Sequence, residues 1–388
     1  MRGLLWTGVA LVVLAGLASW VLPGQVDRRL NQVERAGPDT ASPAAQEALA
    51  RARVVDLHAD PLLWDRDLLE RLSHGQVDLP RLLEGHVAIQ VFGLVTQSPS
   101  SQNFERTPAE DPDTVTLLAV LQRWPLATWR SRFARAVHQA GKLHDAAERS
   151  EGRLTVIRTR ADLEELLAAR AAGERRVGGL LGLEGMHALD GELGNVDRLF
   201  EAGLRMMAPT HFFDNRIGGS SAGVAKHGLT ELGRQAIGRL QELGIVVDVA
   251  HASPRTIDDL LGLATAPLLA SHTGVKATCP GPRNLSDDQI RGIASTGGVV
   301  GIGYFEGAVC GTEPAAIAAA MAHVRRLVGS AHVALGSDFD GAVTTAFDTT
   351  GLALLVDALR AEGFDGDEIQ AALGGNALRV FRSVLPAE

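Results

Sequence analysis

The chain has 388 residues, of which 46% are hydrophobic and 21% are charged, a composition typical of a globular protein with a sizeable core. Its formal net charge of −9 argues against a nucleic-acid partner, for which a basic surface would be expected. Two cysteines, Cys279 and Cys310, are too few for a disulfide framework and lack the Cys-x-x-Cys spacing of a zinc ribbon, so one bridge and two free thiols both stay open.

The first predicted element is an apolar segment over Leu4–Leu22, followed by the basic residues Arg28 and Arg29. Its length approaches the ~20 residues with which a helix crosses a bilayer, and small residues near its end offer a loose signal-peptide cleavage site. The imperfect cleavage pattern favours an uncleaved transmembrane anchor in residues 1–25, while the flanking charges leave its orientation open. A linker or stalk over residues 26–50 would then lead to the main domain of a membrane-anchored or exported protein of the cell envelope.

From residue 51 to the end, short apolar runs alternate with amphipathic stretches. Eight runs are predicted as strands: Val54–His58, Val87–Leu94, Gly179–Glu184, Arg205–His211, Ile245–His251, Pro267–His272, Gly298–Tyr304 and Val333–Asp338. The amphipathic stretches predict helices at Asp162–Ala172, Leu229–Leu243, Ser253–Leu263, Ser286–Thr296 and Ala315–Val328. This alternation indicates parallel βαβ units, and eight of them predict an α/β chain folded as a (β/α)8 TIM-like barrel, with a doubly wound open sheet as the alternative.

The longest connection between predicted strands, residues 96–177, contains a polar segment and a predicted helical pair, Thr114–Trp124 and Thr128–Arg149. A short apolar run follows at Leu154–Ile157. We interpret this region as an insertion above or beside the barrel, in a position suited to a lid.

Metal-binding side chains lie at the ends of the predicted strands. His58 and Asp60 are two positions apart, so their side chains project to the same side of an extended strand. Four further strands end similarly, in the residues Glu184, His211, His251 and His272, and the last strand ends in Asp338. In a (β/α)8 barrel these ends share one rim, where active sites lie. The pattern therefore predicts a metal site at that rim.

Imidazole and carboxylate without thiolate suit zinc, with manganese, iron and cobalt as alternatives. The number of ligands exceeds what one catalytic zinc needs, so two ions that share a carboxylate fit better, with Glu184 as the bridge. Two such ions activate a water and polarise a carbonyl, which indicates metal-assisted hydrolysis.

Six ordered motifs resemble the membrane dipeptidase (renal dipeptidase) family, zinc peptidases of the amidohydrolase-type barrel, over about Val54–Phe381. The motifs are DLHADP at Asp56–Pro61, GLEG at Gly182–Gly185, GLTELG with VDVAH within Gly228–His251, SHTGVKATCPGPRN at Ser271–Asn284, GSDFDG at Gly336–Gly341 and GGNALRVF at Gly374–Phe381. Two residues depart from the family pattern: Ala59 stands where Asn is frequent, and Met186 stands where Gly is frequent. Neither change removes a predicted ligand.

The resemblance implies a role for each residue at the rim. His58 and Asp60 would bind one zinc, His251 and His272 the other, and Glu184 would bridge the two ions. Three further residues would act on the substrate: Asp338 as the acid/base carboxylate, His211 as a substrate contact that stabilises the tetrahedral intermediate, and Arg283 as the ligand of the terminal carboxylate. Asp338 is preferred over Asp340, which is expected to support the loop.

The resemblance also implies the reaction, which is zinc-dependent hydrolysis of dipeptides by a water that two metals activate. One alternative is another amidohydrolase-type enzyme acting on a lactone, a phosphoester or a non-peptide amide. A second alternative is a non-catalytic binding protein tethered to the membrane. The expected partners are a dipeptide substrate and, through the N-terminal segment, a membrane, and a homodimer is left open.

Overall fold

The computed structural model describes residues 21–34 and 40–388. Most of the anchor predicted over residues 1–25 lies outside the described residues. Within the described ranges, no helix combines the length and the apolarity needed to cross a bilayer.

Eight parallel strands form a barrel, as the sequence predicts. They are β1 (Val54–Ala59), β2 (Val87–Val95), β4 (Val177–Glu184), β5 (Leu204–Ala208), β6 (Val246–Val247), β7 (Leu269–Thr273), β8 (Val299–Ile302) and β9 (Val333–Leu335). Each strand pairs with its neighbour in this order, and β9 pairs with β1. A bridge between Asp248 and Leu269 joins β6 to β7 and closes the ring. The alternative of an open sheet is therefore wrong.

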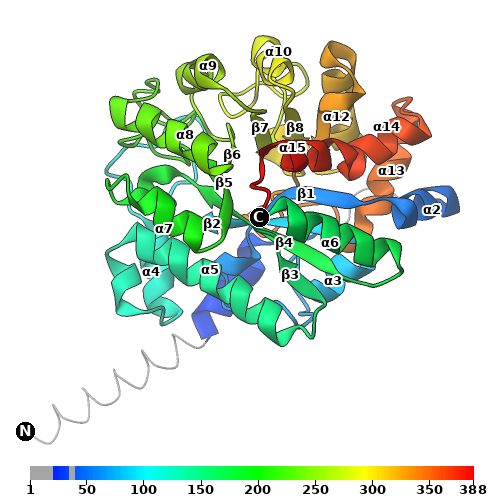
Figure 1. Ribbon diagram of the computed structural model, residues 1–388, viewed down its shortest axis with the longest axis horizontal. Helices are drawn as coiled ribbons and strands as arrows, with labels where there is room; N and C mark the ends of the chain where they lie inside the picture. The colour runs from blue at the N-terminus through cyan, green and yellow to red at the C-terminus, as the bar shows by residue number, and fades with distance from the viewer. Residues whose placement is uncertain (1–20, 35–39) are drawn as a thin grey trace, which may run out of the picture.

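Helices surround the strands in an outer ring (Figure 1). The bounds of helices α2 to α15 are α2 (Pro43–Arg51), α3 (Leu79–Glu84), α4 (Thr114–Leu121), α5 (Arg132–Arg149), α6 (Arg160–Ala171), α7 (Asn195–Glu201), α8 (Glu231–Leu243), α9 (Pro254–Leu263), α10 (Asp287–Ser295), α11 (Glu306–Val309), α12 (Pro314–Val328), α13 (Leu352–Ala361), α14 (Gly366–Gln370) and α15 (Asn376–Val384), of which α4 and α11 lie at the rim and α15 closes one end of the barrel. Side-chain caps fix several starts: Thr159 and Ser286 each form a capping box, at α6 and α10. These local signals explain why the predicted helices agree with the observed ones to within a few residues.

The two largest parts of the core lie inside the barrel and between the strands and the outer helices. All residues of β1, β2 and β4 are buried, as expected for parallel strands covered on both faces. The last helix, α15, contacts β1, β8 and β9 and adds Val380 and Phe381 to the inner core. The backbone of Gly374, just before α15, packs against Arg53 and Val55 at the start of β1. This end of the barrel is thus filled, and a site has to form at the other end.

The region between β2 and β4 holds α4, α5, α6 and a short strand, β3 (Leu154–Val156). Strand β3 pairs with the first half of β4, on the edge that β5 occupies further along, so it lies outside the barrel ring. Helix α5 packs against the barrel wall, whereas residues 98–121 lie at the rim, where they line a cleft described below.

The described parts of the region predicted as a linker, residues 26–34 and 40–50, contact the barrel domain. Residues 21–30 are helical, and Asp27 and Asn31 are buried against the barrel. Helix α2 packs on α13, with Ala45 and Leu49 in the core. The linker over residues 26–50 stays a prediction; in its described parts, polar side chains such as Asp27 bind partners on the barrel.

The two cysteines form a disulfide, Cys279–Cys310. The bridge joins the loop that follows β7 to the end of α11. The same β7–α10 loop carries Arg283, which the bridge thereby holds close to the barrel.

Candidate metal centre and substrate cleft

The predicted rim residues meet at one point, although they come from six strands. His58, Glu184 and His272 lie on β1, β4 and β7, while His211, His251 and Asp338 lie just after β5, β6 and β9. Asp60 follows β1. All seven side chains are buried. Their ligand atoms form three overlapping groups, each close enough to hold a metal ion: His58, His272 and Asp338; Glu184, His211 and His251; and His58, Asp60 and Glu184.

The carboxylate of Glu184 is at the centre of this cluster. Its Oε1 lies 3.0 Å from His58 Nε2, 3.3 Å from His272 Nε2 and 3.7 Å from His251 Nε2. Its Oε2 lies 3.2 Å from His211 Nε2. Neither Glu184 Oε1 nor Asp60 Oδ1 has a hydrogen-bond donor. Buried carboxylate oxygens surrounded by imidazole nitrogens and lacking donors fit divalent cations.

Hydrogen bonds behind His272 set which of its nitrogens faces the cluster. Ser271 Oγ donates to Asp248 Oδ2 at 2.5 Å, so it accepts from His272 Nδ1 at 2.8 Å. The lone pair of His272 Nε2 therefore points at Glu184. His272 Nε2 also lies 2.9 Å from His251 Nε2. The outer hydrogen bond from His272 Nδ1 to Ser271 is of a kind typical of metal-bound histidines.

The electrostatics of His251, His272 and Glu184 agree with ligand roles. Burial, together with the positive charge of Arg283, lowers the pKa of His251 well below the usual value for histidine, and burial also lowers the pKa of His272. Both imidazoles are thus neutral near pH 7 and have a free lone pair. Burial opposes ionisation of Glu184, but the nearby His211 and His58 outweigh it and lower the pKa of Glu184 to about 2. Glu184 is therefore a carboxylate.

The three residues predicted to act on the substrate also lie at the cluster. Asp338 Oδ1 is 3.9 Å from His58 Nε2, and burial raises the pKa of Asp338 well above the usual value. His211 Nδ1 donates to Gln97 O at 3.1 Å, which fixes its ring beside Glu184. Arg283 is buried and donates from Nη2 to the carbonyl of His272, while its Nε has no partner. This unpartnered Nε leaves Arg283 a donor for an anionic group.

Asp340 has a structural environment, as expected for a residue that supports the loop. Its carboxylate accepts hydrogen bonds from Arg66 and from the backbone N–H groups of Gln76 and Val77. Three residues near the cluster have positive φ although they are not glycine: His251 at 61°, Asp338 at 63° and Asp340 at 62°. The surrounding contacts hold these backbones in a conformation that L-residues rarely adopt.

Gly93, on β2, is a site residue that the sequence did not reveal. A Cβ at this position would lie 2.1 Å from Asp60 Oδ1 and 2.7 Å from His58 Cε1. The missing side chain thus provides the space that the first ligand pair occupies. A glycine within a buried apolar strand was the available signal, since such glycines often mark a close approach.

Gly93→Ala is expected to displace Asp60 or His58 and to weaken metal binding by at least ~10–100-fold, the loss typical of disturbing the support of a ligand. Metal content after dialysis against a competing chelator measures this. Gly182→Ala is the matched control, because Gly182 pairs with Gly93 in the sheet and its new Cβ would meet Met206 Cε at 3.0 Å. Equal metal affinity in both variants would contradict the role of Gly93.

A cleft of about 900 Å³ opens from the cluster to the surface. Asp60, Glu184, His211, His251 and Asp338 lie at its floor. Its walls are mostly apolar and come from residues 26–34, from residues 98–121 and from the loops after β8 and β9. A concave, largely apolar cleft with polar groups converging at its floor is typical of a substrate site.

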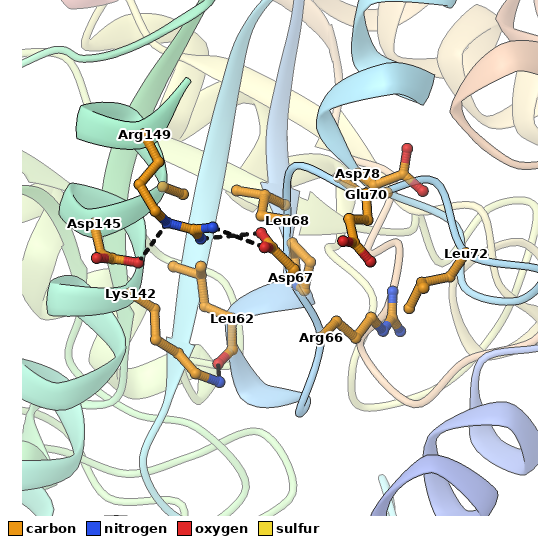
Figure 2. A pocket seen from close by; sticks show the side chains of 13 residues that line it. Leu62, Arg66, Asp67, Leu68, Glu70, Leu72, Asp78, Lys142, Asp145 and Arg149 are labelled. Carbon is orange, nitrogen blue, oxygen red and sulfur yellow. Dashed lines mark hydrogen bonds and ion pairs between the residues drawn. The ribbon is translucent and has the colours of Figure 1, made fainter. Parts of the chain in front are cut away.

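A second, smaller cavity of about 90 Å³ lies beside α5 (Figure 2). Its polar side chains bind one another: Arg149 bonds to Asp67 and Asp145. Burial lowers the pKa of Lys142 to about 8, and its Nζ donates to the carbonyls of Leu62 and Trp64. Lys142 thus secures the turn after Asp60 and has a structural role.

The barrel and its rim cluster define a metal-dependent hydrolase. A model of the membrane dipeptidase family, peptidase family M19, matches residues 43–387. The chain therefore belongs to the membrane dipeptidase family. It is a metallopeptidase, a hydrolase that acts on peptide bonds, as the resemblance implied.

Individual relatives are similar to this chain over much of its length. A protein from Klebsiella pneumoniae, described as uncharacterized and encoded in the pqqA 5′ region, is 33% identical over 61% of this chain and 90% of its own length. Dipeptidase aclJ of Aspergillus oryzae is 27% identical over 87% of this chain and 80% of its own. A crystal structure of a Rhodobacter sphaeroides metallopeptidase, liganded with a phosphinate mimic of the dipeptide L-Ala-D-Ala, is 26% identical with a TM-score of 0.69, over 86% of this chain and 99% of its own.

Proposed function

We propose that this protein hydrolyses dipeptides with two divalent metal ions, preferentially zinc. His58 and Asp60 would hold one ion, His251 and His272 the other, and Glu184 would bridge them. The observation that carries the proposal is the position of Glu184 Oε1, which faces three imidazole nitrogens within 3.7 Å and has no hydrogen-bond donor. Two ions bound there would activate a water for attack and polarise the scissile carbonyl.

The chain's own residues would bind and orient the dipeptide, and they would move a proton from the attacking water to the leaving amine. Arg283 would bind the terminal carboxylate, since its Nε is buried without a partner and an anion is the partner that a guanidinium prefers. His211 would hydrogen-bond the oxyanion that develops during attack. Asp338 would take a proton from the attacking water and pass it to the leaving amine; its raised pKa suits a group that is protonated during the cycle.

The relatives support this substrate class. The dipeptide mimic bound to the Rhodobacter sphaeroides metallopeptidase is a phosphinate, whose tetrahedral centre resembles the product of attack on a peptide carbonyl. The Aspergillus oryzae relative is named a dipeptidase.

The membrane anchor, the cell-envelope location and a homodimer stay predictions. The disulfide Cys279–Cys310 supports an exported domain, because disulfides persist mainly in oxidising compartments. Fractionation of cells that express the full chain would test the location.

The proposed function is tested by metal analysis together with turnover of a dipeptide panel. We expect two ions per chain, dipeptide hydrolysis, its loss after chelation and its return when zinc is added. Two bound ions with turnover of a lactone, a phosphoester or a non-peptide amide, and of no dipeptide, would instead assign the protein to those hydrolases. Absence of both metal and turnover would favour a binding protein.

A further inference from the structure

The part of the chain before the barrel contributes to the substrate cleft. We call residues 21–34 the N-terminal segment. Val26, Leu30 and Glu34 of this segment line the cleft, together with Leu118 and Leu121 of α4. Val26 and Leu30 also pack against the apolar cluster around α4. The segment is thus one wall of the cavity whose floor carries the metal ligands.

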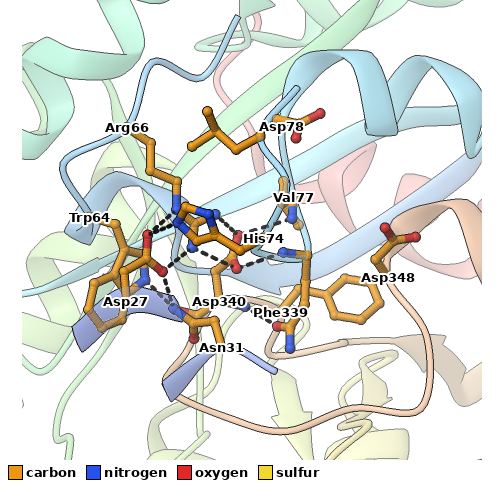
Figure 3. Close-up of polar contacts among 12 residues, drawn as sticks. Asp27, Asn31, Trp64, Arg66, His74, Val77, Asp78, Phe339, Asp340 and Asp348 are labelled. Carbon is orange, nitrogen blue, oxygen red and sulfur yellow. Dashed lines mark hydrogen bonds and ion pairs between the residues drawn. The ribbon is translucent and has the colours of Figure 1, made fainter. Parts of the chain in front are cut away.

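Buried ion pairs fasten this wall to the barrel (Figure 3). Arg66 donates to both oxygens of Asp27, at 2.6 and 2.7 Å, and to both oxygens of Asp340, at 2.8 and 2.9 Å. Asp27 is 2% exposed, and Asp340 is fully buried. Asn31 bonds to Asp27 and also accepts from the backbone N–H of Ala342. A charge network that is buried and fully bonded holds its members in one arrangement.

Asp340, to which Arg66 attaches the N-terminal segment, lies on the same loop as Asp338, the proposed proton carrier. Asp340 lies two residues after Asp338, and Asp338 lies at the floor of the cleft. One loop therefore connects the N-terminal segment to the reacting centre. A change in the position of the segment would change the shape of the cleft beside Asp338.

The chemistry of this wall indicates which substrates it favours. Val26 and Leu30 face a cleft whose other walls include Leu118, Phe104 and Trp64, so the space above the metal ligands is apolar. The binding free energy that an apolar pocket provides grows with the apolar area that the ligand removes from water. A dipeptide with small side chains leaves much of the pocket surface in contact with water and therefore gains less.

We propose that the N-terminal segment is a specificity wall, which selects dipeptides with a bulky apolar side chain through Val26 and Leu30. Asp27, bound through Arg66, is a positioning residue that keeps the wall in place. The inference rests on the proposed dipeptidase function and adds to it a substrate class and the residues that choose it.

The test compares kcat/KM for a leucine- or phenylalanine-containing dipeptide with kcat/KM for Gly-Gly in the metal-loaded full chain. Wild type is expected to prefer the bulky substrate. Leu30→Ala should lower this preference about tenfold, through KM rather than kcat, because it removes contact area from the bulky side chain alone. Leu22→Ala is the matched control: Leu22 is on the same helix, is 44% exposed and does not line the cleft. Leu22→Ala should leave the preference for the bulky substrate unchanged.

Two further variants separate this role from a loss of folding. Leu30→Met keeps the apolar volume of the side chain and should therefore keep the wild-type preference for the bulky substrate. Asp27→Ala should lower the preference as Leu30→Ala does, because the wall loses its attachment, while metal content stays normal.

Other results would overturn the inference. An equal preference in wild type, Leu30→Ala and Leu22→Ala would overturn it and leave the dipeptidase function intact. A metal-loaded wild type that hydrolyses no dipeptide would refute the proposed function, and with it the substrate class inferred here. That failure is visible before any variant is made.

Discussion

Glu184→Gln is expected to abolish dipeptide hydrolysis and to reduce the metal content below two ions per chain. The substitution keeps the shape of the side chain but removes the charge that faces the imidazole nitrogens of His58, His251 and His272. A neutral amide cannot give one anionic oxygen to each of two cations. Without the two bound cations, the pKa of the attacking water returns from ~7 toward ~15.7. We therefore expect kcat/KM to fall at least ~10³-fold.

Metal analysis and steady-state kinetics on the purified variant measure both effects. Glu192→Gln is a suitable control, because Glu192 is an exposed carboxylate in the connection between β4 and β5. A Glu184→Gln enzyme with two tightly bound ions and near-normal turnover would refute the bridging role.

Asp338→Asn should lower kcat by about 10²–10⁴-fold, the usual contribution of a positioned acid or base, while both metals stay bound. Asparagine cannot take a proton from water or deliver one to the leaving amine. It does tolerate the left-handed backbone at this position, where φ is 63°, so the fold should not suffer.

The measurement is kcat with metal content and thermal unfolding followed in parallel. Asp288→Asn provides the control for loss of a carboxylate, since the Asp288 side chain is 94% exposed on α10. If Asp338→Asn retained normal kcat with both ions bound, the proton shuttle would have to be another group.

Most of the barrel could be predicted from the sequence, because its signals are local. Each barrel strand is a short apolar run, and helices such as α6 and α10 begin at Thr and Ser caps. The cluster could be predicted for a related reason. In a closed parallel barrel, the residue at each strand end lies at the same rim, so the ends of separate strands combine into one pattern. The roles of the individual residues still depend on the family resemblance.

Other features depend on contacts between distant residues, which local patterns do not contain. The sequence does not distinguish Gly93 from the other glycines, because its role depends on the close approach of the Asp60 side chain. The N-terminal segment looks solvent-exposed because Asp27 is a charged residue, and its partner Arg66 is 39 residues away. The pairing of Cys279 with Cys310 likewise depends on how two loops meet at the rim.

The positive φ angles at the rim have a consequence for protein engineering. His251, Asp338 and Asp340 each adopt a left-handed backbone conformation, which costs most L-residues roughly 1–2 kcal/mol and Asp less. The surrounding contacts compensate for this strain, which keeps the side chains of His251 and Asp338 in the cleft and the carboxylate of Asp340 on Arg66. A search for thermostable variants would find easy gains here by relaxing these backbones, and those gains would come at the expense of turnover. Libraries aimed at heat resistance should therefore leave this rim unchanged and vary the outer helices.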